Sequence, residues 1–180
     1  MQCFWARGYV GSSIGRLTAQ MQMPRASLYH RFGDKKGLFL ASLDHYAATR
    51  TGVVMANLSA RGNAPAEIGA FFEDMVKLVC ETPETRGCLV ACVLADAAGT
   101  DRHLRAILRR KFEILEEKLH ACLVADARSV LPDRLRATAA MLAATARGLA
   151  LGARADTPAE TLHATARIAV ELACPPRKDG

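Results

Sequence analysis

Helical periodicity runs through almost all of this 180-residue sequence and constrains its fold more than any other feature. Apolar residues recur three or four positions apart, the spacing that gathers side chains on one face of an α-helix. No run alternates apolar and polar residues between turn-forming residues, as a half-buried β-strand would. The sequence therefore predicts an all-α protein.

Turn and capping residues divide the chain into the predicted helices. Ser12-Ser13 can cap a short helix over 14–20, and a second short helix runs over 24–32 and ends at Gly33. Asp34 can cap a third helix over 35–60. Further helices are predicted from Pro65 to a break at 82–84, over 89–98, from Asp101 through Leu123, over 135–155, and from Thr157 to Cys174, where Thr157-Pro158-Ala159-Glu160 has the pattern of a capping box.

The composition fits a globular protein, with 51% hydrophobic and 23% charged residues. No apolar run is long enough to span a bilayer, and the N-terminal sequence MQCFWARGYVG lacks the charged-then-apolar pattern of a signal peptide. We therefore expect a cytoplasmic protein. In that reducing compartment its six cysteines, none of which forms a CxxC pair, are expected to be free thiols.

Positive charge is concentrated near the N-terminus. Residues 1–50 contain seven lysines and arginines against two aspartates, a net charge of +5, whereas the whole chain carries +6. A basic segment beside a nearly neutral body is typical of a protein that binds a polyanion, most simply nucleic acid. A solvated basic face has the same composition, so charge alone does not decide between the two.

Two short helices joined by a tight turn within this basic segment form the pattern of a helix-turn-helix. The second helix of such a motif enters the major groove, where its first residues reach the base edges. Here Arg25 can donate two hydrogen bonds to a guanine, Ala26 can pack on a thymine methyl group, and Ser27 can contact a base or a phosphate. We expect Leu28 and Phe32 to face the core instead.

Basic and polar side chains further along the segment can contact the DNA backbone. Tyr29 and His30 can donate to phosphates, and Arg31 adds positive charge. Lys35 can reach another phosphate beside the positive end of the third helix. Each such contact adds affinity that depends on salt and not on DNA sequence.

The order of residues in this region strengthens the helix-turn-helix prediction. Phe4, Gly8-Tyr9, Ser12-Ser13-Ile14 and Leu17, followed by SLYHRFGDKKGLF over 27–39, resemble the DNA-binding domain of the TetR family of bacterial transcriptional regulators. The resemblance implies that three helices bind DNA, that a fourth links them to the body, and that the body binds a ligand and dimerises. The expected DNA-binding residues are Ser12, Ser13, Gly15, Arg16, Arg25, Ala26, Ser27, Tyr29, His30, Arg31 and Lys35.

The resemblance also sets the expected domain organisation. It implies a helix-turn-helix domain over 1–45 and a ligand-binding and dimerisation domain over 46–180. The last two helices, over 132–155 and 158–174, would form a homodimer interface, and their alanine content suits close helix approach.

Three departures from the family pattern lie in the DNA-binding region. We expect the first helix to be truncated to residues 1–7 and the core behind the helix-turn-helix to lack apolar cover, at a cost of several kcal/mol. Gln22 stands where the family favours glycine. Pro24 stands where the family favours a capping serine or threonine, and the loss of a cap costs about 1 kcal/mol.

Several phenylalanines and methionines on the predicted helices after residue 46 are candidates to line a ligand pocket. Apolar stripes of this kind more often pack in the hydrophobic core, and that alternative stays open. The candidate pocket residues are Phe71, Phe72, Met75, Phe112 and Met141.

Cys88 and Cys92 lie four positions apart and so share a helix face. Arg86 and a helix N-terminus near Cys88 would favour its thiolate, which suggests a thiol sensor for oxidants or electrophiles. The alternative is two small buried residues. A metal site of Cys88, Cys92 and His103 is compatible with the spacing, but we predict neither a metal nor a cofactor.

No catalytic pattern occurs in the sequence: it has no nucleophile elbow, no Gly-rich phosphate loop and no HExxH. We therefore predict a homodimeric repressor and not an enzyme. It would bind a palindromic operator in double-stranded DNA and be released by a small-molecule inducer. The alternative is a truncated dimerisation and ligand-binding protein of the same family that does not bind DNA.

Overall fold

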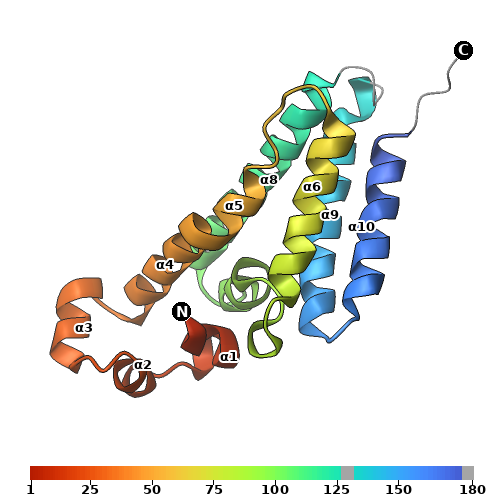
Figure 1. The fold of residues 1–180 in the computed structure, drawn as a ribbon. Helices are drawn as coiled ribbons and strands as arrows, with labels where there is room; N and C mark the ends of the chain where they lie inside the picture. The colour runs from red at the N-terminus through yellow and green to blue at the C-terminus, as the bar shows by residue number, and fades with distance from the viewer. Residues whose placement is uncertain (127–131, 176–180) are drawn as a thin grey trace, which may run out of the picture.

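The structure of the chain is a computed structural model that describes residues 1–126 and 132–175. All regular structure in these residues is helical, as predicted (Figure 1). The elements in chain order are α1 (Gln2–Gly11), α2 (Ile14–Gln20), α3 (Arg25–Phe32), α4 (Lys35–Tyr46), η1 (Ala47–Thr51), α5 (Gly52–Met55), α6 (Ala64–Cys80), η2 (Pro83–Thr85), η3 (Leu89–Leu94), α7 (Ala95–Ala98), α8 (Arg102–Ala125), η4 (Pro132–Arg134), α9 (Leu135–Arg154) and α10 (Ala159–Ala173).

The short N-terminal helices begin at the caps that the sequence predicts. The Ser13 hydroxyl accepts a hydrogen bond from the N–H of Arg16 and starts α2. The Asp34 carboxylate accepts one from the N–H of Gly37 at 2.7 Å and starts α4. Local side-chain chemistry therefore sets where α2 and α4 begin.

The third predicted helix is shorter and less regular than expected. The chain stays helical from Lys35 only to Met55, and its middle part, η1, is a π-helical turn. Gly52 makes this turn sterically accessible, because a Cβ atom there would lie 2.6 Å from the carbonyl oxygen of Ala47. The prediction of a helix reaching residue 60 is therefore wrong at its end.

The predicted capping box before the last helix is also wrong. Pro158 and not Thr157 is the residue that precedes α10, and its side chain makes no capping hydrogen bond. The N–H of Thr157 donates to the carbonyl oxygen of Gly152 at 2.9 Å, so Thr157 closes the end of α9 instead.

One apolar core lies between α6, α8, α9 and α10. The predicted stripe of α6 points into it, and Ile68 and Val76 are fully buried. Leu119 and Leu123 of α8 and Leu142 of α9 pack against the same core. Alanines fill much of the α9 and α10 faces, so these helices approach closely.

A second apolar core lies behind the helix-turn-helix, contrary to the expectation that it lacks cover. Phe4 and Trp5 are 0% and 3% exposed. The Phe4 ring lies 4.9 Å from that of Phe39 and the Trp5 ring 5.1 Å from that of Tyr46, measured between centroids. Residues of η3, α7 and the start of α8 complete this core, among them Leu89. These contacts cross the predicted boundary at residues 45–46, and the two-domain division stays a prediction.

The molecule is elongated, with α2 and α3 at one end and α6, α9 and α10 toward the other (Figure 1). The continuous helical segment α4–η1–α5 runs from α3 into the body. Among the described residues, no helix is both long and apolar enough to cross a membrane.

Candidate functional site: a basic helix and an apolar cavity

The outer face of α3 exposes the side chains that the sequence assigns to DNA. Arg25, Tyr29, His30 and Arg31 are all exposed, whereas Leu28 is fully buried in the core behind them. Ala26 and Ser27 are exposed in the first turn of the helix. A single short helix therefore presents polar and basic groups outward and is held to its domain by its apolar side.

Arg25 lies against the first turn of α2. A Cβ atom built at Gly15 would lie 3.2 Å from Nη2 of Arg25, so the guanidinium rests over the glycine. Ser13 and Arg16 flank this position and are exposed. The structure thus brings Ser13, Gly15, Arg16 and Arg25, which come from both helices of the motif, onto one surface.

Ser12 does not belong to this surface. It is 0% exposed, and its hydroxyl donates to the carbonyl oxygen of Gly8 at 2.7 Å. The expectation that Ser12 binds DNA is therefore wrong: the residue instead secures the turn between α1 and α2. A sequence pattern does not separate it from its exposed neighbour Ser13.

The Lys35 side chain is turned toward α1. Its ammonium donates to the carbonyl oxygen of Tyr9 at 3.2 Å and lies 4.4 Å from the centre of the Tyr9 ring. Lys35 is half-buried in this position. Its contact with a phosphate stays a prediction and requires the side chain to leave Tyr9.

Polar contacts connect the helix-turn-helix to the body. Lys36 of α4 forms an ion pair with Asp101, the residue before α8, at 2.7 Å. The Arg154 guanidinium, at the end of α9, donates to the carbonyl oxygen of Trp5 at 3.0 Å. Sequence reasoning missed both connections, because the partners lie 65 and 149 positions apart in the chain.

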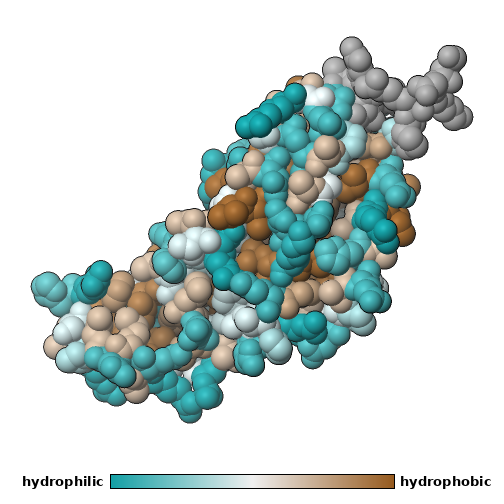
Figure 2. Space-filling model, viewed as in Figure 1, coloured by the Kyte–Doolittle hydropathy of each residue, from teal (hydrophilic) through white to brown (hydrophobic). Residues whose placement is uncertain are grey.

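An apolar cavity of about 500 Å³ opens in the body between α5, α6, α8 and α9. Figure 2 shows apolar side chains gathered between α5 and α6, where the cavity lies. Three of the five predicted pocket residues, Phe71, Met75 and Phe112, line it. Both π-helical segments, η1 and η3, also contribute to its wall, and π-turns are frequent at functional sites.

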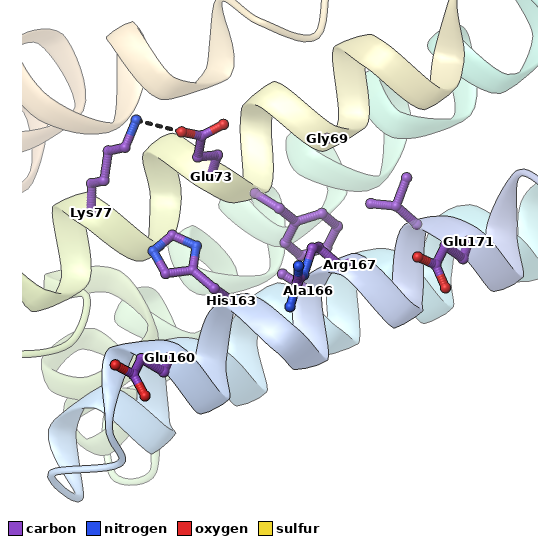
Figure 3. A pocket seen from close by; sticks show the side chains of 10 residues that line it. Gly69, Glu73, Lys77, Glu160, His163, Ala166, Arg167 and Glu171 are labelled. Carbon is purple, nitrogen blue, oxygen red and sulfur yellow. Dashed lines mark ion pairs between the residues drawn. The ribbon is translucent and has the colours of Figure 1, made fainter.

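The other two predicted pocket residues lie elsewhere. Met141 is 40% exposed on the outer side of α9, so its assignment to the pocket is wrong. Phe72 faces a second hollow of about 670 Å³ between α6 and α10. Figure 3 shows that this hollow is rimmed by charges of both signs, with an ion pair between Lys77 and Glu73.

The two predicted sensor cysteines lie in different surroundings. Cys88 lines the cavity and is half-buried next to Tyr46, a residue that also contacts Trp5. Burial raises the pKa of Cys92, whose thiol faces the carbonyl oxygen of Ala150. Only Cys88 is therefore open to a molecule in the cavity.

Two of the possibilities raised for these cysteines are not supported. The Arg86 guanidinium pairs with Asp156 at 3.0 Å, so it is engaged away from the Cys88 thiol. Among residues 1–126 and 132–175, no three metal-ligating side chains cluster, so Cys88, Cys92 and His103 do not form a metal site there.

Comparison with known proteins relates the helix-turn-helix to one family of regulators. The sequence pattern of the bacterial regulatory proteins, tetR family, matches residues 1–42, which include α1, α2 and α3. Two structures of cysteine-substituted forms of the TetR family transcriptional regulator CifR, each complexed with 26-bp double-strand operator DNA, are 26% identical to this chain. One of them superposes with a TM-score of 0.84 over 97% of this chain and 92% of that chain. Residues 1–42 of the chain thus match the TetR family, and the whole fold is similar to that of a TetR family regulator. Members of this family are transcriptional regulators, a class distinct from enzymes.

Two curated relatives match this chain over only part of their length. The uncharacterized HTH-type transcriptional regulator YezE of Bacillus subtilis is 25% identical over 67% of this chain and 62% of its own length. The HTH-type transcriptional repressor NemR of Escherichia coli is 26% identical over 57% of this chain and 52% of its own. The chain thus spans about half to three fifths of the length of these two curated relatives.

Proposed function

We propose that the protein is a transcriptional repressor that binds a two-fold symmetric operator as a homodimer and leaves it when a small molecule occupies the cavity. The observation that carries the proposal is the exposed face of α3, where Arg25, Tyr29, His30 and Arg31 stand together on the segment that matches the family's pattern. Relatives are named repressors, and CifR has been solved on operator DNA. A protein of this kind acts on the chromosome, in the cytoplasm.

The charge of α3 suits a DNA surface in two ways. Arg25 in the first turn can pair with the two acceptors of a guanine edge, which gives sequence preference. Tyr29, His30 and Arg31 can contact phosphates, which gives affinity that weakens with salt. The N-terminal fifty residues carry +5 of the chain's net charge of +6 and so add a long-range attraction.

The exposed apolar side chains on the outer faces of α9 and α10 support the homodimer. Met141 and Leu151 of α9 are 40% and 52% exposed, and Ile168 and Leu172 of α10 are 55% and 73% exposed. Large apolar side chains gathered on two adjacent helices are characteristic of an interface between protein chains. A two-fold axis there would place two α3 helices on one face of a duplex.

The helical segment α4–η1–α5 is the proposed link between ligand and DNA. Ala47, Thr51 and Met55 line the cavity, while the other end of the same segment begins directly after α3. A ligand that fits better when this segment is displaced would favour a conformation in which the two α3 helices of the dimer are spaced differently. The affinity for the operator would then fall as the ligand concentration rises.

A mobility-shift titration against the DNA upstream of the reading frame tests the proposal. We expect a salt-sensitive complex with the wild-type protein and its loss in an Arg25→Ala, Tyr29→Ala double variant. Arg102→Ala, a substitution at an exposed residue of α8, is the matched control and should retain binding. A folded wild-type dimer that binds no DNA at low salt would favour the alternative, a dimerisation and ligand-binding protein without DNA binding.

A further inference from the structure

The charged residues that line the apolar cavity are all basic. They are Lys111 and Lys118 of α8 and Arg147 of α9. Among the described lining residues there is no aspartate or glutamate. The cavity wall therefore combines a large apolar surface with positive charge, a pairing that ordinary core packing does not require.

The basic residues have fixed positions relative to the apolar wall. Lys111, Leu115 and Lys118 are spaced by four and three positions, so they share one face of α8 with Leu115 between the two lysines. The Arg147 guanidinium lies 4.6 Å from the centre of the Phe112 ring, which places a cation over an aromatic floor.

Their charges are neutralised to different degrees. Arg147 pairs with Glu116 at 3.2 Å, and Lys111 lies 3.9 Å from Asp44, whose side chain is 81% exposed. Lys118 donates to the carbonyl oxygen of Leu58 at 3.5 Å, and none of the ion pairs found in the described part of the chain includes it. Lys118 thus brings to the cavity wall a positive charge that none of these ion pairs neutralises.

We propose that the cavity selects an apolar molecule that carries one acidic group, such as a medium-chain or aromatic carboxylate, and that the acid pairs with Lys118. The proposal rests on the proposed function, since it names the class of ligand for the same cavity. An acid there gains a charge-assisted hydrogen bond in a partly buried place. A neutral analogue gains only the burial of its apolar part, and an amine meets three cations of its own sign.

Calorimetric titrations with decanoate, 1-decanol and decylamine, each below its aggregation threshold, test this selectivity. We expect decanoate to bind about ten- to a hundredfold more tightly than 1-decanol, the range for one hydrogen bond to a charged group. Lys118→Met should remove that preference while leaving the affinity for 1-decanol unchanged. Lys118→Arg should keep the preference, which separates a loss of charge from a loss of fold.

Two controls locate the binding site. Lys77→Met makes the same substitution on α6, outside this cavity, and should not change the preference. Thr51→Phe places a bulky side chain at the cavity wall and should weaken the binding of all three compounds.

The outcomes separate this inference from the proposed function. Equal binding of decanoate and 1-decanol, both weakened by Thr51→Phe, would overturn the acid preference and leave the cavity as a ligand site. A preference that survives Lys118→Met would overturn the role of Lys118. Binding of no compound, or binding that Thr51→Phe does not affect, would overturn the ligand site itself and the acid preference with it.

Discussion

The Nζ atom of Lys36 lies 2.7 Å from Oδ2 of Asp101, and this ion pair joins α4 to the residue that starts α8. The other oxygen of the same carboxylate accepts hydrogen bonds from the N–H groups of His103 and Leu104 at 2.8 and 3.0 Å. One side chain therefore caps the helix that lines the cavity and also holds the helix that follows α3.

This arrangement predicts a specific pH dependence of stability. The hydrogen bond from Lys36, together with those from the N–H groups of Leu104 and His103, lowers the pKa of Asp101 to about 2. A carboxyl group with a depressed pKa stabilises the folded state above its unfolded pKa, near 4, and that contribution is lost as the pH falls toward 2. We expect Asp101→Asn, which keeps a capping oxygen but loses the charge, to lower the free energy of unfolding more at about pH 5 than near pH 2.5.

Urea unfolding of the two proteins at both pH values measures this difference. Asp96→Asn, at an exposed aspartate of α7, is the matched control and should show no pH-dependent difference from the wild type. A deficit of Asp101→Asn that is the same at both pH values would show that the ion pair is not its cause.

A second prediction concerns Gln22, in the turn between α2 and α3. Its φ of 50° lies in the left-handed region, which costs a non-glycine residue about 1–2 kcal/mol. Glycine avoids this cost but loses about 0.5–1 kcal/mol of chain entropy, so Gln22→Gly should stabilise the fold by up to about 1.5 kcal/mol. The same substitution at Gln20, the last residue of α2, should destabilise it. The midpoints of urea unfolding compare the two variants, and equal destabilisation would show that residue 22 is not strained.

A third prediction concerns thiol modification. Alkylation of Cys88 with iodoacetamide would place an amide in the cavity beside the α4–η1–α5 segment, and we expect the affinity for operator DNA to fall about tenfold or more. Treated Cys88→Ser protein should keep its affinity. Cys92→Ser should respond like the wild type, because burial raises the pKa of the Cys92 thiol and keeps it unreactive. Unchanged DNA affinity after complete labelling of Cys88 would leave the two cysteines as small packing residues.

A fourth prediction tests the proposed dimer face. Ile168 and Leu172 are one helical turn apart on the exposed side of α10, so an Ile168→Glu, Leu172→Glu variant places two charges in the interface. Light scattering after size exclusion should give twice 19.4 kDa for the wild type and a single chain for the variant. Val124→Glu, at an exposed apolar residue of α8, should remain dimeric. A wild-type monomer, or a double variant that stays dimeric, would place the interface elsewhere or remove it.

The sequence predicts most helices because their caps act within a few residues. Ser13 and Asp34 bond N–H groups three positions ahead, so reading the local pattern is enough to place α2 and α4. The reading surface of α3 follows from the same local logic. Helical periodicity also predicts the buried stripe of α6, which includes Phe72. It does not predict that Phe72 faces the hollow between α6 and α10, because that depends on where α10 packs.

Features that depend on distant partners could not be predicted. Trp5 and Phe4 are covered by η3, α7 and α8, which lie more than eighty residues away in the chain. The π-turn at Ala47–Thr51 has a composition that suits an ordinary α-helix, and only Gly52 hints at the close backbone approach. Lys111 and Lys118 of α8 and Arg147 of α9 line the same cavity. Their spacing in the sequence does not reveal that they share it.

The preference of the protein for upstream DNA over a shuffled duplex tests the central claim most directly. Fluorescence anisotropy at one salt concentration should give an affinity ratio of about 10³ or more for the wild type, the range of specific DNA-binding proteins. Arg25→Ala should lower the difference in binding free energy between the two duplexes by about 1–3 kcal/mol, because it removes a base contact. Arg31→Ala should weaken binding to both duplexes alike. A wild-type protein that binds both duplexes equally, or an Arg25→Ala variant with an unchanged ratio, would contradict the assignment of α3 as the helix that reads the operator.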